Sequence, residues 1–108
     1  MNDKPKESDW KLYRKLVPEL RERYLTAKNR EFACMLTGES KTPTECFWDT
    51  LDEMRKEEKI LVECLDRQSR SRMFMSMTLM CRCGILKRED LHDFSDELQG
   101  ELERCLKS

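Results

Sequence analysis

The chain has 108 residues, of which 21 are Lys or Arg and 22 are Asp or Glu, so its formal net charge is −1. That length fits a single domain, and the balanced charge excludes disordered chains that combine low hydrophobicity with a large net charge. No segment approaches the roughly 18 apolar residues of a membrane span, and the first ten residues lack the apolar centre of a signal peptide. We therefore expect a cytoplasmic protein with a disordered tail over residues 1–8 and one helical-bundle domain over residues 9–108.

Cysteine usage supports the same location. The chain has six cysteines, which is a smaller share than the roughly 8–10% typical of disulfide-built scaffolds. They fall inside helical patterns rather than in loops. Reduced, half-buried thiols are therefore the expected state, as in other cytosolic proteins.

The first predicted element is a long helix over about residues 9–37. Its apolar side chains recur near the 3.6-residue period of an amphipathic helix; they are Tyr13, Leu16, Val17, Leu20, Tyr24, Ala27 and Met35. Pro18 removes one helix hydrogen bond, so the segment is either a short turn followed by a long helix or one helix kinked at Pro18. Gly38 is the predicted end, because glycine tolerates the left-handed conformation at a helix C-terminus.

The clearest local signal is Thr42-Pro43-Thr44-Glu45, a capping box with proline at the first helical position. It predicts a helix from there to about Arg67. The apolar residues of this helix form one stripe that needs a neighbour to cover it; they are Phe47, Trp48, Leu51, Met54, Leu61, Val62 and Leu65. The stripe is wide at its start, where two aromatic residues are consecutive and so lie about 100° apart.

Residues 69–83 are apolar over most of the helix circumference, unlike the other predicted helices. Ser69 is the predicted cap of this short helix, and Gly84 followed by Ile85 predicts a Schellman close. We expect this segment at the centre of the fold. A fourth helix is expected from about Arg88, with an acidic first turn and an apolar stripe; the stripe consists of Leu91, Phe94, Leu98, Leu102, Cys105 and Leu106.

Together these elements predict an all-α fold, a four-helix antiparallel bundle with a short, highly apolar third helix. Residues 11–31 carry seven basic and three acidic residues, whereas residues 89–103 carry seven acidic residues and no Lys or Arg. The first and fourth helices would attract each other as neighbours, although each exposed pair contributes only a few tenths of a kcal/mol.

A candidate anion-binding turn lies at the start of the third helix; its residues are Arg67, Ser69, Arg70, Ser71 and Arg72. Cations there meet the positive end of the helix dipole, which favours a nearby anion. That anion is either an external phosphate or carboxylate or, as we favour, an internal partner such as Asp66 or Glu63. Nucleic acid is disfavoured, because the basic cluster is short, the pI is about 5.9 and no aromatic residue interleaves with it.

The metal candidates are weaker, and they are Glu31, Glu58, Met77 and Cys81. Met77 and Cys81 belong to a sulfur-rich run suited to copper(I), but core packing is the favoured interpretation. Glu31 and Glu58 fall inside apolar stripes, and facing glutamates can hold two metals or act as acid and base. A di-metal bundle site also needs Glu-x-x-His pairs, and the chain has one histidine. We therefore expect no metal and no cofactor.

The candidate interface residues are Trp10, Phe47, Trp48 and Leu51. A bundle with one short helix leaves part of a wide aromatic stripe uncovered, and such a patch marks a partner or dimer site. The sequence contains no HExxH, CxxC, GxSxG or glycine-rich phosphate loop. We therefore expect a non-enzymatic regulator or assembly module, acting on a protein partner or as a homodimer. An anion- or nucleic-acid-binding protein and a metal-binding bundle or enzyme are the alternatives.

Overall fold

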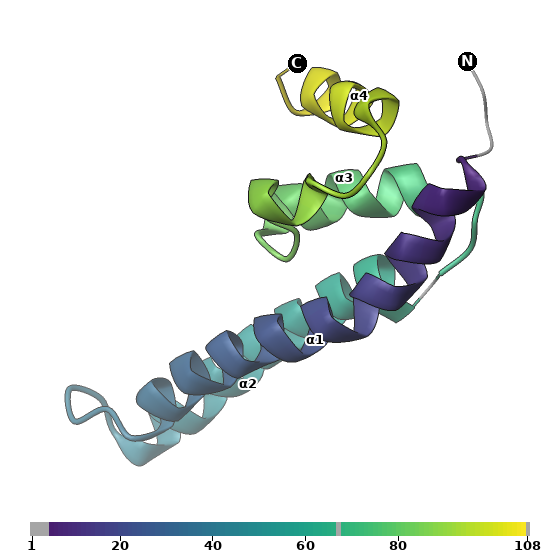
Figure 1. Cartoon of the computed structure of the whole chain (residues 1–108). Helices are drawn as coiled ribbons and strands as arrows, with labels where there is room; N and C mark the ends of the chain where they lie inside the picture. The colour runs from purple at the N-terminus through teal and green to yellow at the C-terminus, as the bar shows by residue number, and fades with distance from the viewer. Residues whose placement is uncertain (1–4, 67, 108) are drawn as a thin grey trace.

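The computed structural model describes residues 5–66 and 68–107, and all regular structure in these residues is helical (Figure 1). In chain order the elements are α1 (Glu7–Leu36), α2 (Pro43–Leu61), the π-helical turn η1 (Val62–Asp66), α3 (Met73–Cys83), the 3₁₀ turn η2 (Arg88–Leu91) and α4 (Asp96–Lys107). The prediction of an all-α chain with four α-helices is confirmed over this part of the chain. The molecule is elongated, 53 × 24 × 20 Å, because the α1–α2 hairpin extends well beyond α3 and α4.

α1 is a single helix of 30 residues with Pro18 inside it. Figure 1 shows its N-terminal turns tilted relative to the rest of the helix, as expected when proline removes a hydrogen bond. Of the two alternatives, one kinked helix is the correct one. The helix begins at Glu7, so the last two residues of the expected tail are helical, while residues 1–4 lie outside the described residues.

α2 begins with the predicted capping box. The Thr42 hydroxyl accepts the Glu45 N–H at 3.2 Å, and the Glu45 carboxylate accepts the Thr42 N–H at 3.1 Å. The other end differs from the prediction, because α2 stops at Leu61 and continues as η1. A π-helical turn is wider than an α-helical turn, so it shifts the phase of the side chains that follow. Arg67, the predicted end, lies outside the described residues.

α3 starts later than predicted. Ser69 caps the turn in front of the helix, where its hydroxyl accepts the Arg72 N–H at 3.3 Å. The end of α3 closes as predicted, since Gly84 has a φ of 80° and the Ile85 N–H donates to the Met80 carbonyl at 2.9 Å.

The predicted fourth helix is divided in two. η2 takes the first turn, and α4 begins only at Asp96, where the Ser95 hydroxyl accepts the Leu98 N–H at 3.3 Å. The buried Asp9 carboxylate of α1 accepts the Ser95 N–H at 2.9 Å and the Ser95 hydroxyl at 2.6 Å. The start of α4 is thus fixed to the start of α1.

α3 and α4 run parallel to each other, so the prediction of an antiparallel bundle is wrong for this pair. Both begin beside the start of α1, because Arg70, just before α3, donates to Glu7 at 2.7 Å and α4 is held there by Asp9. Their C-terminal ends also meet, where Arg82 donates to the Cys105 carbonyl at 3.4 Å. The physical reason is the segment around η2, which carries the chain back along α3 before α4 begins (Figure 1).

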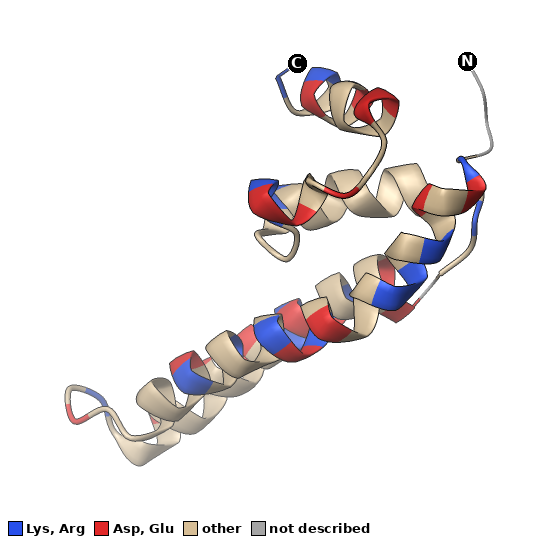
Figure 2. Cartoon of the chain, in the orientation of Figure 1, with Lys and Arg blue, Asp and Glu red and all other residues tan. Residues whose placement is uncertain are grey.

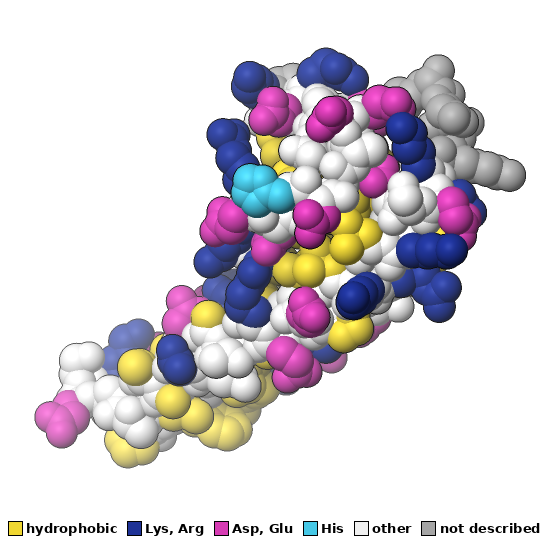
Figure 3. Space-filling model, viewed as in Figure 1, with side chains coloured by type: hydrophobic (Ala, Val, Ile, Leu, Met, Phe, Trp, Pro, Cys, Tyr) yellow, Lys and Arg dark blue, Asp and Glu magenta, His cyan; other side chains and the backbone are white. Residues whose placement is uncertain are grey.

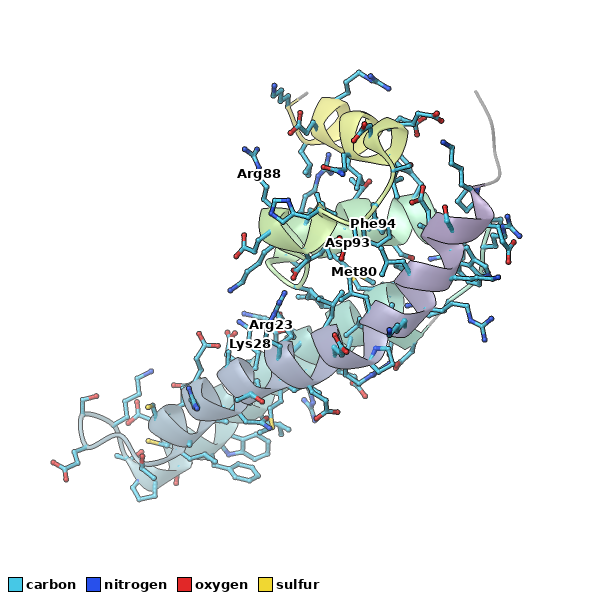
Figure 4. All side chains as sticks on the ribbon, viewed as in Figure 1. Arg23, Lys28, Met80, Arg88, Asp93 and Phe94 are labelled. Carbon is cyan, nitrogen blue, oxygen red and sulfur yellow. The ribbon has the colours of Figure 1, made fainter. Side chains whose placement is uncertain are left out.

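The core lies in what we call the base, residues 5–24, 62–66 and 68–107. Its buried cluster consists of Tyr13, Val17, Leu20, Tyr24, Cys64, Leu65, Met73, Met77, Met80, Ile85, Leu86, Leu91, Phe94, Leu98 and Leu102. Met73, Met77 and Met80 of α3 are 0% exposed, which confirms α3 as the central helix. Figure 2 shows that most of α3 is free of charge, and in Figure 4 Met80 and Phe94 lie between α1 and the α3–α4 layer.

Two ion pairs join the basic side of α1 to the acidic C-terminal segment. Arg23 contacts Asp90 at 2.6 Å, and it also donates to the Ile85 carbonyl at 3.0 Å. Lys6 contacts Glu97 at 3.0 Å. Figure 4 shows Arg23 projecting from α1 toward this layer, in agreement with the predicted attraction between the two segments.

Candidate interaction surface

α2 turns a polar face toward α1. Its buried residues are Cys46, Thr50 and Glu57, which recur at spacings of four and seven and therefore lie on one side of the helix. We call them the inner face of α2. We call residues 25–61 the distal hairpin. It contains the inner face of α2, and none of its residues belongs to the buried cluster of the base.

The apolar stripe of α2 lies roughly 100° around the helix from the inner face. We call it the outer stripe; it consists of Phe47, Trp48, Leu51, Met54, Leu61 and Val62. Phe47 and Trp48 are each 54% exposed and Met54 is 41% exposed, while the other three are half-buried. The stripe is therefore covered only in part, and Phe47 and Trp48 at its start are left exposed. Figure 3 shows hydrophobic side chains gathered along the distal hairpin.

A groove of about 360 Å³ continues the outer stripe toward the base. It lies between α1 and α2, and its lining residues are Arg21, Leu25, Asn29, Phe32, Met54, Glu57, Glu58, Leu61, Val62 and Asp66. At its base end Arg21 and Asp66 form an ion pair at 2.8 Å, so those two charges are already matched. The exposed aromatic pair and the hollow therefore lie at opposite ends of one apolar surface.

The aromatic pair itself is held edge to face. The ring centroids of Phe47 and Trp48 are 5.0 Å apart with an interplanar angle of 90°, an arrangement that aromatic rings prefer. Leu36, 49% exposed, adds to the apolar surface of the distal hairpin. The interface candidates Phe47, Trp48 and Leu51 thus share one surface.

Trp10, the fourth interface candidate, lies apart from them. It stacks on Tyr13 with centroids 5.9 Å apart, and the Arg14 guanidinium lies 5.8 Å from its ring centroid. It packs against the base, near the start of α1, whereas Phe47 follows the loop at the end of α1. A helix of 30 residues separates these ends by about 45 Å.

Glu57 is a buried charged residue that was not among the candidates predicted from the sequence. It is 9% exposed, its carboxylate accepts the Tyr24 hydroxyl, and its other oxygen lies 3.4 Å from Lys28 Nζ. Burial, reinforced by the hydrogen bond to Glu57, raises the pKa of the Tyr24 hydroxyl. The signal in the sequence was the seven-residue spacing from Thr50 to Glu57, which places both side chains on the same side of α2.

The carboxylates singled out from the sequence are not brought together in a buried site. The Glu31 side chain is 62% exposed and pairs with Lys28 at 3.2 Å, while Glu58 is exposed at the rim of the groove. Within residues 5–66 and 68–107, no group of three or more His, Cys, Asp or Glu side chains is placed to hold a metal ion.

Both described arginines of the candidate anion site have carboxylate partners within the chain. Arg70 donates to Glu7 at 2.7 Å and to the Pro5 carbonyl at 2.9 Å. Arg72 lies 3.5 Å from Glu63, one of the internal partners anticipated from the sequence. Ser69 and Ser71 face each other with hydroxyl oxygens 3.4 Å apart, and Arg67 lies outside the described residues.

The sulfur-rich segment packs as core. Met77 is fully buried and Cys81 is half-buried, and burial raises the pKa of the Cys81 thiol. A raised pKa leaves less thiolate, which is the form that attacks electrophiles or binds metals. Cys81 is therefore a poor nucleophile.

A second hollow, of about 670 Å³, lies between the end of α3, η2 and α4. Its lining residues are Cys81, Gly84, Leu86, Lys87, Arg88, Glu89, Leu91, His92, Gln99, Leu102, Glu103, Leu106 and Lys107. Its apolar floor belongs to the core of the base, and its rim mixes both signs of charge. The lining therefore favours no particular class of ligand.

Comparisons with protein-family models, with curated proteins and with solved structures each find no match to this chain. None of the described helices is both long enough and apolar enough to cross a membrane. The functional conclusion below therefore rests on the chain's own side chains.

Proposed function

We propose that this chain is a non-enzymatic interaction module that forms a homodimer through the outer stripe of α2. The observation that carries the proposal is the exposure of Phe47 and Trp48, 54% each, on a stripe that α1 leaves open. Aromatic side chains are enriched in protein interfaces and dominate their energetics. Covering each of them again would contribute about 1.5–3 kcal/mol.

A second copy of the chain suits this surface. The net charge of −1 gives little long-range repulsion between copies. Arg55 and Glu58, both exposed, lie among the residues of the outer stripe and have opposite charges, so a second copy in reverse orientation meets each charge with its opposite. Arg70 and Arg72 already have partners in the chain, which favours self-association over the anion-binding alternative.

The proposal keeps the cytoplasmic location expected from the sequence. It is supported by the cysteine content, because six cysteines are a smaller share than disulfide-built scaffolds carry. Free thiols persist where the compartment is reducing.

The experiment is native mass spectrometry of the untagged chain, purified in low salt without chelator, combined with sedimentation velocity over a range of concentrations. We expect a dimer without additional mass. A dimer that carries a defined metal or nucleotide mass would favour the metal or anion alternatives, and a monomer at every concentration would contradict the proposal.

Trp48→Glu is the decisive variant, and Met75→Glu is its matched control. Both place a carboxylate on an exposed apolar position, but Met75, 51% exposed, lies on α3. In a two-fold dimer each residue contributes to the interface twice. Trp48→Glu should therefore remove about 3–6 kcal/mol from the free energy of dimerisation and weaken dimerisation about 100-fold or more. Equal weakening by Met75→Glu would contradict the assignment of the surface to α2.

A further inference from the structure

We infer that the two copies pack α2 against α2 in antiparallel orientation, with the Phe47–Trp48 pair of each copy inserted into the groove of the other. This inference rests on the proposed homodimer and specifies its geometry. The outer stripe carries two exposed aromatic side chains, which protrude, at one end and lines a groove at the other.

The two ends of the outer stripe are matched in position. Phe47 and Trp48 lie in the first turns of α2, while Leu61 and Val62 lie at its end and line the groove. The separation of 14 residues, from Phe47 to Leu61, corresponds to about 21 Å along an α-helix. In a two-fold dimer the same patch faces itself, so a protrusion meets a hollow only if the helices run antiparallel.

The symmetry fixes the register. A two-fold axis beside Met54 and Arg55 lies midway between the aromatic pair and Leu61, which lines the groove near its base end. It places the aromatic pair of each copy at the base end of the other copy's groove. Met54 then packs near Met54 of the partner subunit. Each Arg55 comes within about one turn of the partner's Glu58, so the exposed charges within the stripe are also matched.

The groove has the chemistry to accept an indole. Leu25 and Phe32 of α1 contribute apolar lining together with Leu61 of α2 and Val62 of η1. Its volume of about 360 Å³ is that of a site for one compact group. Asn29 and Glu58 offer acceptor oxygens for the indole N–H, which needs a partner when it is buried.

Complementation between two defective variants tests this geometry. The first variant, Phe47→Ala/Trp48→Ala, lacks the protrusion and keeps the groove. The second, Leu25→Glu, keeps the protrusion and places a charge in the groove. Each variant alone should dimerise at least 100-fold more weakly than the unmodified chain, because both of its contacts are lost.

Mixing the two variants should restore association. The heterodimer keeps one intact contact, the aromatic pair of the Leu25→Glu chain in the groove of the other chain. Native mass spectrometry, which separates the three dimers by mass, should therefore show mainly heterodimer, at least tenfold weaker than the unmodified dimer but stronger than either variant homodimer. Ala27→Glu on the exposed side of α1, which does not line the groove, should dimerise normally.

The outcomes separate the geometry from the proposed function. If the unmodified chain dimerises and Trp48→Glu does not, but Leu25→Glu still dimerises or the mixture gives no heterodimer, the antiparallel geometry is overturned while the homodimer stands. A monomeric unmodified chain overturns both. Circular dichroism checks that each variant is folded, and Asn29→Lys, at an exposed position on the rim, replaces Leu25→Glu if that variant unfolds.

Discussion

The base and the distal hairpin share α1 but differ in what packs against it. In the base, α1 contributes Tyr13, Val17 and Leu20 to a closed apolar cluster around α3. In the distal hairpin, the buried residues of α2 are Cys46, Thr50 and Glu57, while Phe47, Trp48 and Met54 are exposed. The base therefore completes its core within one chain, whereas the distal hairpin leaves its most apolar surface for something outside the fold.

The polar inner face contributes specificity more than stability. Bringing the Glu57 carboxylate out of water costs free energy, which its contacts with Tyr24 and Lys28 offset. Such a network fixes how the two helices align, since a slip of one residue would leave a charge buried without partners. The distal hairpin thus holds its outer stripe in a defined place with little core of its own.

The largest expected effect is in the base. Met77→Ala leaves a cavity where the side chain is 0% exposed, so it should cost about 2–5 kcal/mol of the free energy of unfolding. Urea denaturation followed by circular dichroism measures this loss. Met75→Ala, on the exposed side of the same helix, should change stability by less than about 0.5 kcal/mol. Similar losses for both variants would mean that α3 is not the centre of the core.

Breaking the inner face should have a smaller and more local effect. Glu57→Ala leaves the Tyr24 hydroxyl without its acceptor and should cost about 1–3 kcal/mol. Hydrogen exchange should accelerate in the distal hairpin and stay unchanged in α3, because the base keeps its own core. Asp52→Ala, at an exposed position of the same helix that does not line the groove, is the control and should be nearly neutral. Faster exchange throughout α3 would show that the two regions unfold as one unit.

The Arg23–Asp90 pair gives the base a dependence on pH. Hydrogen bonds from Arg23 lower the pKa of the Asp90 carboxyl below its ordinary value of 3.8. A carboxyl with a lowered pKa in the folded state contributes stability that is present above about pH 4 and lost as the pH falls through the folded pKa. Asp90→Asn should therefore cost about 1–2 kcal/mol at neutral pH and less at a pH well below 3.8.

Urea denaturation at both pH values measures this difference, and Asp93→Asn is the matched control. Asp93 is exposed and lies shortly after Asp90, so its replacement should have little effect at either pH. An Asp90→Asn loss of equal size at both pH values would show that charge is not the stabilising factor.

Local signals in the sequence predicted the start of α2 and the end of α3, whereas the end of α2 and the starts of α3 and α4 differ from the prediction. The capping box at Thr42 and the close at Gly84 depend on neighbouring residues only, and the structure has both. The parallel arrangement of α3 and α4 could not be predicted in this way. It depends on hydrogen bonds between Asp9 and Ser95, which are far apart in the sequence. Asp9 is buried in the structure, but in the sequence it has the pattern of an ordinary residue at the start of a helix.

Periodicity grouped three of the four interface candidates, Phe47, Trp48 and Leu51, on one stripe of α2, while Trp10 packs against the base. Periodicity ranks the faces of a helix by hydrophobicity, so it could not predict which polar residues face the neighbouring helix. The inner face is instead set by Glu57, whose partners Tyr24 and Lys28 come from another helix.

The smallest expected effect distinguishes a surface made for a partner from one that supports its own hairpin. In dilute solution, where the chain is monomeric, Trp48→Ala should change the free energy of unfolding by less than about 0.5 kcal/mol, because the side chain is already 54% exposed. At high concentration the dimer stabilises the unmodified chain by mass action, so its Tm should rise with concentration while that of Trp48→Ala stays constant. Differential scanning calorimetry over a concentration series measures both. A loss above about 1 kcal/mol in the dilute sample would instead assign Trp48 to the hairpin itself, through its edge-to-face contact with Phe47.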